Sequence, residues 1–229
     1  RCAADPDDRF QLAGDGALLW DGAVVGRLVA GPAFLAPAVA VDDSEFLTAP
    51  HRDALRRRLA ARVEAEVAAV LAPLLRLGRV PLDGPGRGLA FQLVEAQGCL
   101  ARGGAEPQLA ALSPADRARL TRAGVRFGAE WIYLAPLLRP AAVGLRAVLW
   151  GGAAGTPAPA PPHPGRLGLP RADGVPADFY RTIGYPLLGP RALRVDRLEA
   201  LAAAARRQAR SGPFVATKEL ANLADARPV

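Results

Sequence analysis

The stretch Gly124–Gly152, GVRFGAEWIYLAPLLRPAAVGLRAVLWGG, is expected to form the centre of the fold. It holds two of the three tryptophans and a long apolar run that only single arginines interrupt. Val125–Phe127 and Trp131–Leu134 predict two short strands around a turn at Gly128. Pro140 opens a predicted buried helix, which stops at the two glycines that close the stretch. The centre of the protein is therefore expected to be a hairpin followed by a buried helix.

Two further helices are predicted before this stretch. Ser113 has the properties of an N-cap, Pro114 occupies the first helical position, and Gly124 marks the stop. The segment RGLAFQLVEAQGCL, Arg87–Leu100, has apolar residues at helical spacing, and Gly103-Gly104 is expected to end that helix.

A small antiparallel meander is predicted near the N-terminus. Ala17–Trp20 and Ala23–Val29 are short apolar runs joined by Asp21-Gly22, which is a strong signal for a two-residue hairpin. Ala38–Val41 is a candidate third strand. A meander of this size needs another element to pack against it.

A long helix follows the meander and is expected to cover it. Its apolar residues recur every three or four positions: Leu55, Leu59, Val63, Val67, Val70, Leu71 and Leu74. Pro73 should kink or end this helix. Arginines crowd its other faces: Arg52, Arg56, Arg57, Arg58 and Arg62. They are either a solvated face or a stripe that follows phosphates, and an anionic partner would relieve their mutual repulsion.

Residues 153–172 include TPAPAPPHPG and have the composition of an extended linker. We therefore expect a β-meander plus helical accessory domain over 1–152 and a small helix and hairpin module over 173–229. The expected elements of this module are a helix over Pro176–Ile183, strands over Tyr185–Leu188 and Ala192–Val195, a helix from Asp196 to about Arg210 and a helix that Thr217 caps. The layout is typical of a truncated winged-helix element. The fold class is α+β and predominantly α-helical, with short β-hairpins.

The formal net charge is +7, and Lys218 is the only lysine. Such a basic chain favours an anionic partner, usually nucleic acid, because the planar guanidinium binds phosphate and stacks on bases. The alternative is that the arginines reflect a GC-rich genome. Cys2 and Cys99 form no disulfide framework, so a reducing, cytoplasmic location is expected. No signal peptide or membrane-spanning run is recognisable. Because the chain starts at Arg1 and lacks methionine, we expect a fragment of a longer polypeptide.

Catalytic patterns are not recognisable, which leaves enzymatic activity uncertain. Lys218 follows Thr217 without the glycine loop of a nucleotide-binding P-loop. DGPGRG at Asp83–Gly88 precedes a helix, and it is either a plain loop or, less in keeping with its proline, an anion-binding helix start. The histidines, cysteines and serines are too scattered to predict a metal site or a nucleophile. A self-contained hydrolase or transferase therefore has little support.

Arginines and aromatic residues remain as the candidate functional groups. Within Gly124–Gly152, Trp131 and Tyr133 alternate with Ile132, so one face of a strand is expected to be core. The alternative is that these two rings and the nearby arginines form a basic platform on which a base stacks, worth about 1–3 kcal/mol per base.

Three segments resemble a known family. RGLAFQLVEAQG (Arg87–Gly98), GVRFGAEWIYLAPLLRP (Gly124–Pro140) and FYRTIGYPLLGPRALRVDRLEALA (Phe179–Ala202) resemble the C-terminal region of bacterial helicase-related proteins. Those proteins are similar to the mitochondrial degradosome RNA helicase. WDGAVVGRLVAGP (Trp20–Pro32) and FVATKEL (Phe214–Leu220) fit the same region, whereas Ala135-Pro136 departs from it because the proline is expected first. The Pro-rich linker also departs from the family.

The resemblance implies that the chain is an accessory region of an ATP-dependent, superfamily-two helicase whose motor domains lie upstream. It implies ATP and Mg²⁺ for the parent motor but no cofactor in this segment. It identifies no catalytic residue in this chain, because the motor motifs lie outside it. Expected partners are single-stranded RNA or DNA, the upstream motor and a nuclease. No contact with a membrane is expected. The alternative function is a scaffold module that docks the motor or a nuclease. The candidate nucleic-acid contacts are Arg56, Arg57, Arg87, Arg126, Trp131, Tyr133, Arg139, Arg191 and Arg194.

Overall fold

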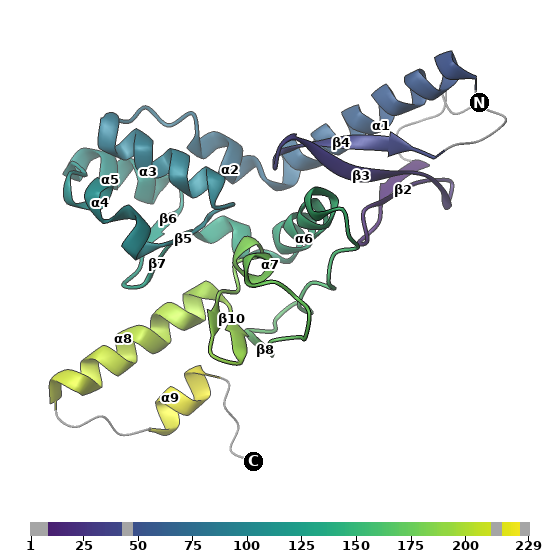
Figure 1. Ribbon diagram of the computed structural model, residues 1–229. Coiled ribbons are helices and arrows are strands. Elements are labelled where there is room, and N and C mark those ends of the chain that lie inside the picture. The colour runs from purple at the N-terminus through teal and green to yellow at the C-terminus, as the bar shows by residue number, and fades with distance from the viewer. Residues whose placement is uncertain (1–8, 43–47, 212–216, 225–229) are drawn as a thin grey trace. The chain divides into compact units, whose positions relative to one another are not determined.

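The structure, a computed structural model, describes residues 9–42, 48–211 and 217–224. It combines a four-stranded antiparallel sheet, two three-stranded sheets and a majority of helix, so the predicted α+β class is confirmed (Figure 1). The chain divides into two compact units. Unit 1 comprises residues 1–72 and 144–161, and unit 2 comprises residues 73–143 and 162–229. This division differs from the predicted boundaries at 152 and 172.

Unit 1 contains the predicted meander as a sheet of four strands in the order β1-β2-β3-β4. The strands are β1 (Phe10–Leu12), β2 (Ala17–Trp20), β3 (Ala23–Ala33) and β4 (Ala36–Val41). Asp21 and Gly22 have φ values of 48° and 81°. Positive φ at both positions is what a type I′ turn requires, so the predicted hairpin is confirmed.

Helix α1 (Ala49–Val70) lies along β4 in unit 1 (Figure 1). Its buried residues follow the predicted spacing of four: Leu55, Leu59, Val63 and Val67. The helix ends before Pro73, as predicted, and α2 (Ala72–Leu77) starts with that proline in its first turn. The part of α6 (Pro140–Ala154) that belongs to unit 1 is also buried, and a side chain at Gly152 would touch Leu28 of β3. The helix continues through both glycines that were expected to stop it.

In unit 2, α3 (Gly84–Glu95) ends five residues before the predicted end at Leu100. Gln97 and Gly98 both have positive φ, and the Gly98 N–H donates to the Leu93 carbonyl at 2.8 Å. With the Gln97 N–H donating to the Val94 carbonyl, this is a Schellman termination. The sequence reading was wrong here because a non-glycine residue adopts the left-handed conformation. Cys99–Ala101 is strand β5 instead of helix.

The next part of unit 2 agrees with the predictions. Helix α5 (Pro114–Arg122) follows α4 (Glu106–Ala110), and the Ser113 hydroxyl accepts a hydrogen bond from the Asp116 N–H at 3.1 Å. Strands β6 (Val125–Phe127) and β7 (Trp131–Leu134) have the predicted bounds. With β5 they form an antiparallel sheet in the order β5-β7-β6.

The C-terminal part of unit 2 forms a second small sheet in the order β8-β10-β9. Its elements are β8 (Gly168–Pro170), α7 (Ala177–Thr182), β9 (Leu187–Leu188), β10 (Arg191–Leu193), α8 (Val195–Ser211) and α9 (Lys218–Leu223). Strand β8 pairs with β10, so the end of the predicted linker over 153–172 is part of a sheet. The Thr217 hydroxyl caps α9, as predicted. The winged-helix likeness stays a prediction.

Candidate nucleic-acid interface

The two units differ in charge. Residues 73–143 and 162–229, which form unit 2, contain 20 basic and 11 acidic residues, a formal net charge of +9. Residues 1–72 and 144–161, which form unit 1, contain 9 basic and 11 acidic residues, a net charge of −2. The positive charge that predicts an anionic partner is therefore confined to unit 2, which holds seven of the nine candidate contacts.

Arg56 and Arg57 lie in unit 1 on α1, where both contact Asp53. An Arg56 guanidinium nitrogen is 2.7 Å from the Asp53 carboxylate, and Arg57 donates to the Asp53 carbonyl oxygen at 3.4 Å. Two neighbours on the helix are engaged as well, because Arg58 lies over the Phe10 ring and Arg62 pairs with Glu66 at 3.0 Å. These contacts support the interpretation of the arginine stripe as a solvated, internally paired face.

Strand β7 separates the aromatic residues from the core. Ile132 and Leu134 are fully buried on one face, whereas Trp131 and Tyr133 are half-buried on the other. The prediction that one face of this strand is core is therefore confirmed by the burial of Ile132 and Leu134. Arg126 of β6 lies directly opposite Tyr133 in the antiparallel register, so the two side chains share a face.

Tyr133 lies within a cluster of charged groups. Burial raises the pKa of the Tyr133 hydroxyl, and the carboxylates of Asp196 and Glu199 raise it further, whereas Arg126 and Arg194 lower it. The structure thus brings Arg126, Tyr133 and Arg194 together from three separate segments of the chain. Sequence reasoning named all three but did not predict that they meet.

Arg194 is already committed to a partner inside the cluster. Its Nε and one terminal nitrogen each lie 2.7 Å from an Asp196 carboxylate oxygen, in the bidentate geometry that arginine forms with carboxylates. The hydrogen bond to Asp196 raises the pKa of the Arg194 guanidinium. Arg191 is half-buried in β10, opposite Pro170 and Leu188. Neither side chain is fully available for phosphate.

A carboxylate holds the turn that precedes β7. The Glu199 side chain in α8 accepts hydrogen bonds from the backbone N–H groups of Ala129, Glu130 and Trp131 at 2.6, 2.9 and 2.6 Å. A side chain at Gly128 would collide with this carboxylate. Successive N–H groups in a turn form an anion-binding concavity, and here the protein supplies the anion. Sequence reasoning missed Glu199, because nothing local connects residues so far apart.

A second internal carboxylate occupies the start of α3. Asp116 is buried, accepts a hydrogen bond from the Asp83 N–H at 3.0 Å and pairs with Arg119 at 2.7 Å. A side chain at Gly86 would meet the same carboxylate. The segment Asp83–Gly88 therefore faces a resident carboxylate where an anion-binding site would need space, which favours the plain-loop interpretation.

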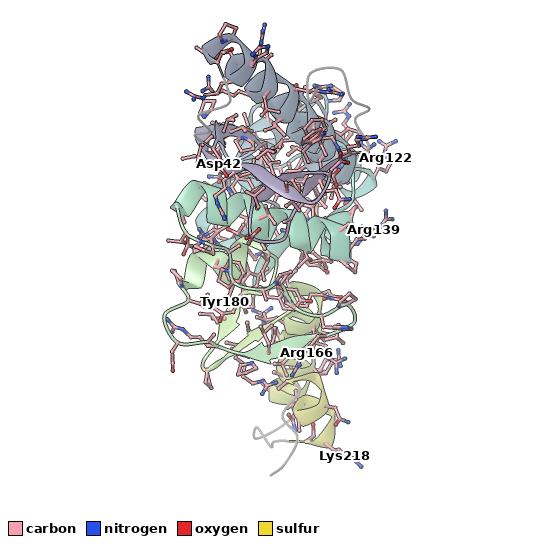
Figure 2. All side chains as sticks on the ribbon, turned by 90° about the vertical axis from the view of Figure 1, so that its right-hand side faces the viewer. Asp42, Arg122, Arg139, Arg166, Tyr180 and Lys218 are labelled. Carbon is pink, nitrogen blue, oxygen red and sulfur yellow. The ribbon has the colours of Figure 1, made fainter. Side chains whose placement is uncertain are left out.

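Three candidate arginines remain available. Arg87, Arg126 and Arg139 are exposed, and their side chains make no hydrogen bond or ion pair with any residue in the described part of the chain. Figure 2 shows the Arg139 side chain projecting away from the ribbon. Sequence reasoning missed Phe91, which lies one helical turn beyond Arg87 on α3 and is 65% exposed. An exposed aromatic ring beside an unpaired guanidinium has the chemistry that stacks on a base and contacts its phosphate.

Trp131 faces an apolar groove in unit 2 of about 650 Å³. Strand β9 and helices α8 and α9 supply most of its lining, and Glu130 is its one charged lining residue within the described chain. Trp131 therefore belongs to the β6-β7 hairpin and also lines this groove. The alternative interpretation of Trp131 and Tyr133 was a platform on which a base stacks. Helix α8 contacts β7 and partly covers these two side chains.

The described residues include no group of three or more histidine, cysteine or acidic side chains that could hold a metal ion. No helix among them is long and apolar enough to cross a membrane. No family model, curated protein or solved structure matches the chain. The resemblance to helicase-related proteins therefore stays a prediction.

Proposed function

We propose that this chain is an accessory region of an ATP-dependent RNA or DNA helicase and that unit 2 binds the backbone of a single strand. The observation that carries the proposal is the net charge of +9 in unit 2, together with the exposed Arg87, Arg126 and Arg139, which make no ion pair with a described residue. The surface of unit 1, where Arg56, Arg57, Arg58 and Arg62 of α1 contact neighbouring side chains or backbone, is not part of the proposed contact.

The proposed contacts are Arg126 and Arg139 at the phosphates, with Arg87 and Phe91 as a second point of contact on α3. Guanidinium groups without an internal partner bind phosphate without first breaking an ion pair. Arg194 takes a positioning role, because it is bound to Asp196 beside Tyr133. The strand would be guided relative to the motor domains of the parent protein.

ATP and Mg²⁺ belong to the parent motor in this proposal. The sequence of this chain offers no glycine loop before a lysine and no P-loop of its own. No step of nucleotide hydrolysis is therefore assigned to these residues. The cytoplasmic location is likewise a proposal, supported by the small number of cysteines, Cys2 and Cys99, which make no disulfide framework in the sequence.

A salt titration of binding tests the proposal. The chain is mixed with a fluorescein-labelled oligouridine of roughly 16 nucleotides, or with the matching oligothymidine, and anisotropy gives the affinity at several salt concentrations. Each phosphate neutralised should add about 0.7 to the slope of log affinity against log salt. Affinity that falls with a slope of about 2 or more supports backbone binding. Affinity too weak to measure at low salt contradicts the proposal.

A second candidate function is a scaffold module that docks the motor or a nuclease. The apolar groove between β7, β9, α8 and α9 favours it. In that case, reversing the charges of Arg126 and Arg139 leaves nucleic-acid binding unchanged, and Leu188→Asp, which places a charge in the groove, weakens capture of the protein partner.

A further inference from the structure

Phe91 of α3 is the most exposed large apolar side chain in the described part of the chain. It is 65% exposed, whereas the next such side chain is 47% exposed. Its neighbours along the helix surface are Arg87 and Gly88, one turn before it, and Glu95, one turn after it. None of these neighbours has an apolar side chain, so the ring is not part of an apolar patch on α3. Protein partners bind to larger apolar patches, and an isolated ring better fits a single flat ligand.

The helix surface beside the Phe91 ring is open. Side chains of a helix lean toward its N-terminus, so the ring lies over the turn that contains Arg87 and Gly88. A methyl group added at Gly88 would meet only the Gln108 side chain, at 3.8 Å, and one added at Gly84 would meet no atom within 4 Å. The backbone of α3 is therefore bare next to the ring, and a flat ligand can approach it closely.

Packing explains one of the three glycines of α3 but not Gly88. A side chain at Gly86 would collide with the Asp116 carboxylate, which lies 2.7 Å from the added carbon. Gly88 has no positive φ and has room for a side chain, so neither the backbone nor the packing requires glycine there. Glycine is unfavourable inside a helix, and it is used where a ligand must approach the backbone closely. Gly88 thus supports a ligand beside Phe91.

The charges beside the ring favour a ligand that carries a phosphate. Arg87 is exposed and makes no ion pair with a described residue, not even with Asp83, which lies one turn earlier. Its guanidinium can therefore bind an anion without first breaking an internal pair. Glu95, on the other side of the ring, is exposed and repels an anion. A phosphate is expected at Arg87, with the flat part of the same ligand on Phe91.

From these observations we propose that α3 holds a site for one unpaired nucleobase, an inference that rests on the proposed function and specifies its substrate. The base stacks on the Phe91 ring beside the backbone of Gly88, and its phosphate contacts Arg87. A base within a duplex is paired and stacked on its neighbours, so its face is not available to the ring. The site therefore selects single strands. Arginines alone do not provide this selectivity, because a duplex carries more phosphate charge per unit length.

Three ligands of equal length test the proposal with the full chain. They are an oligouridine of about 16 nucleotides, an abasic oligomer with the same number of phosphates, and the duplex of the oligouridine with oligoadenosine. Oligouridine should bind about tenfold more tightly than either of the others, because only its bases are present and unpaired. Oligothymidine and its abasic and duplex forms repeat the comparison for DNA. An abasic oligomer or a duplex that binds as tightly as the single strand, in both series, overturns the base site.

Matched variants locate the site. Phe91→Ala should abolish the preference for oligouridine over the abasic oligomer, whereas Leu188→Ala, at another exposed apolar residue of unit 2, should retain it. Gly88→Ala should raise the thermal unfolding midpoint by about 2–4 °C, because alanine favours helix, and yet weaken oligouridine binding by about threefold or more. Gly144→Ala of α6, where an added methyl group also has room, is the control that should leave binding unchanged. A preference that survives Phe91→Ala, or unchanged binding by Gly88→Ala, contradicts the assignment.

The salt dependence separates this inference from the proposed function. The abasic oligomer keeps every phosphate, so its salt slope should equal that of oligouridine while its affinity is lower. Equal affinities with a slope of about 2 or more overturn the base site and leave backbone binding by the arginines intact. The absence of salt-dependent binding by every ligand overturns the proposed function and the base site with it.

Discussion

The carboxylate of Glu199 in α8 accepts a hydrogen bond from the backbone N–H of Trp131 in β7 at 2.6 Å, across 68 residues of sequence. The same carboxylate holds two further N–H groups of the turn. It therefore joins the C-terminal part of unit 2 to the hairpin that the sequence identified as central. This contact also places the aromatic face of β7 beside the groove.

Replacement of Glu199 by alanine should destabilise the chain by about 1–3 kcal/mol, because three N–H groups lose a charged acceptor. Glu199→Gln retains one acceptor oxygen and should cause a smaller loss. Urea unfolding followed by circular dichroism measures the difference, with the exposed Glu64→Gln on α1 as a control that changes stability by less than about 0.5 kcal/mol. Equal stability of the Glu199→Ala variant and the unaltered chain would refute the role of this carboxylate.

Asp116→Ala should be at least as destabilising, by about 2–3 kcal/mol, because it removes the buried carboxylate that accepts from the Asp83 N–H and pairs with Arg119. The measurement is again chemical unfolding. Asp53→Ala on α1 removes a carboxylate of an exposed pair and serves as the control, with an expected change below about 1 kcal/mol. Similar losses in both variants would show that Asp116 does not hold the start of α3.

Alkaline pH should weaken the fold through Tyr133. The pKa of its hydroxyl is raised in the folded state, chiefly by burial, so the folded chain keeps the proton longer than the unfolded chain. The resulting stabilisation is full below the ordinary tyrosine pKa of about 10 and is lost as the pH rises through the raised value. Tyr133→Phe, which cannot ionise, should lose less stability between about pH 9 and pH 11 in denaturant titrations. Parallel losses in both proteins would argue against the raised pKa.

Arg87 and Phe91 should affect strand binding in different ways, although they are one helical turn apart on α3. Arg87→Glu should lower the salt slope of binding by about 0.7, as expected for one lost phosphate contact. Phe91→Ala should weaken binding by about 1–3 kcal/mol without changing the slope, since stacking releases no counterions. Anisotropy titrations with oligouridine distinguish the two. Unchanged affinity in both variants would remove α3 from the interface.

Local patterns predicted the parts of the fold that depend on neighbouring residues. The hairpin at Asp21-Gly22, the strands β6 and β7, and the caps at Ser113 and Thr217 each follow from a few adjacent side chains. The end of α3 was missed because Gln97 takes a left-handed conformation that sequence patterns assign to glycine. Strand β8 was missed because its proline- and glycine-rich surroundings have the composition of a linker, and only pairing with β10 makes it a strand.

The candidate site was predictable in its residue types and not in its assembly. Arginines and aromatic rings were named from composition, but the internal partners of Arg56 and Arg194 depend on three-dimensional proximity. The two resident carboxylates, Glu199 and Asp116, act on backbone groups remote in sequence, and local patterns do not predict such contacts. The groove likewise requires α8, α9 and β7 to meet.

The central claim is that the unpaired arginines of unit 2 bind a nucleic-acid strand. Its most direct test compares the Arg126→Glu, Arg139→Glu double variant with the Arg56→Glu, Arg57→Glu double variant of unit 1 in oligouridine binding at several salt concentrations. The account predicts that the first variant loses about 1.4 from the salt slope, two phosphate contacts, while the second binds like the unaltered chain. Equal binding by the first variant and the unaltered chain, or an equal loss in both variants, would contradict it.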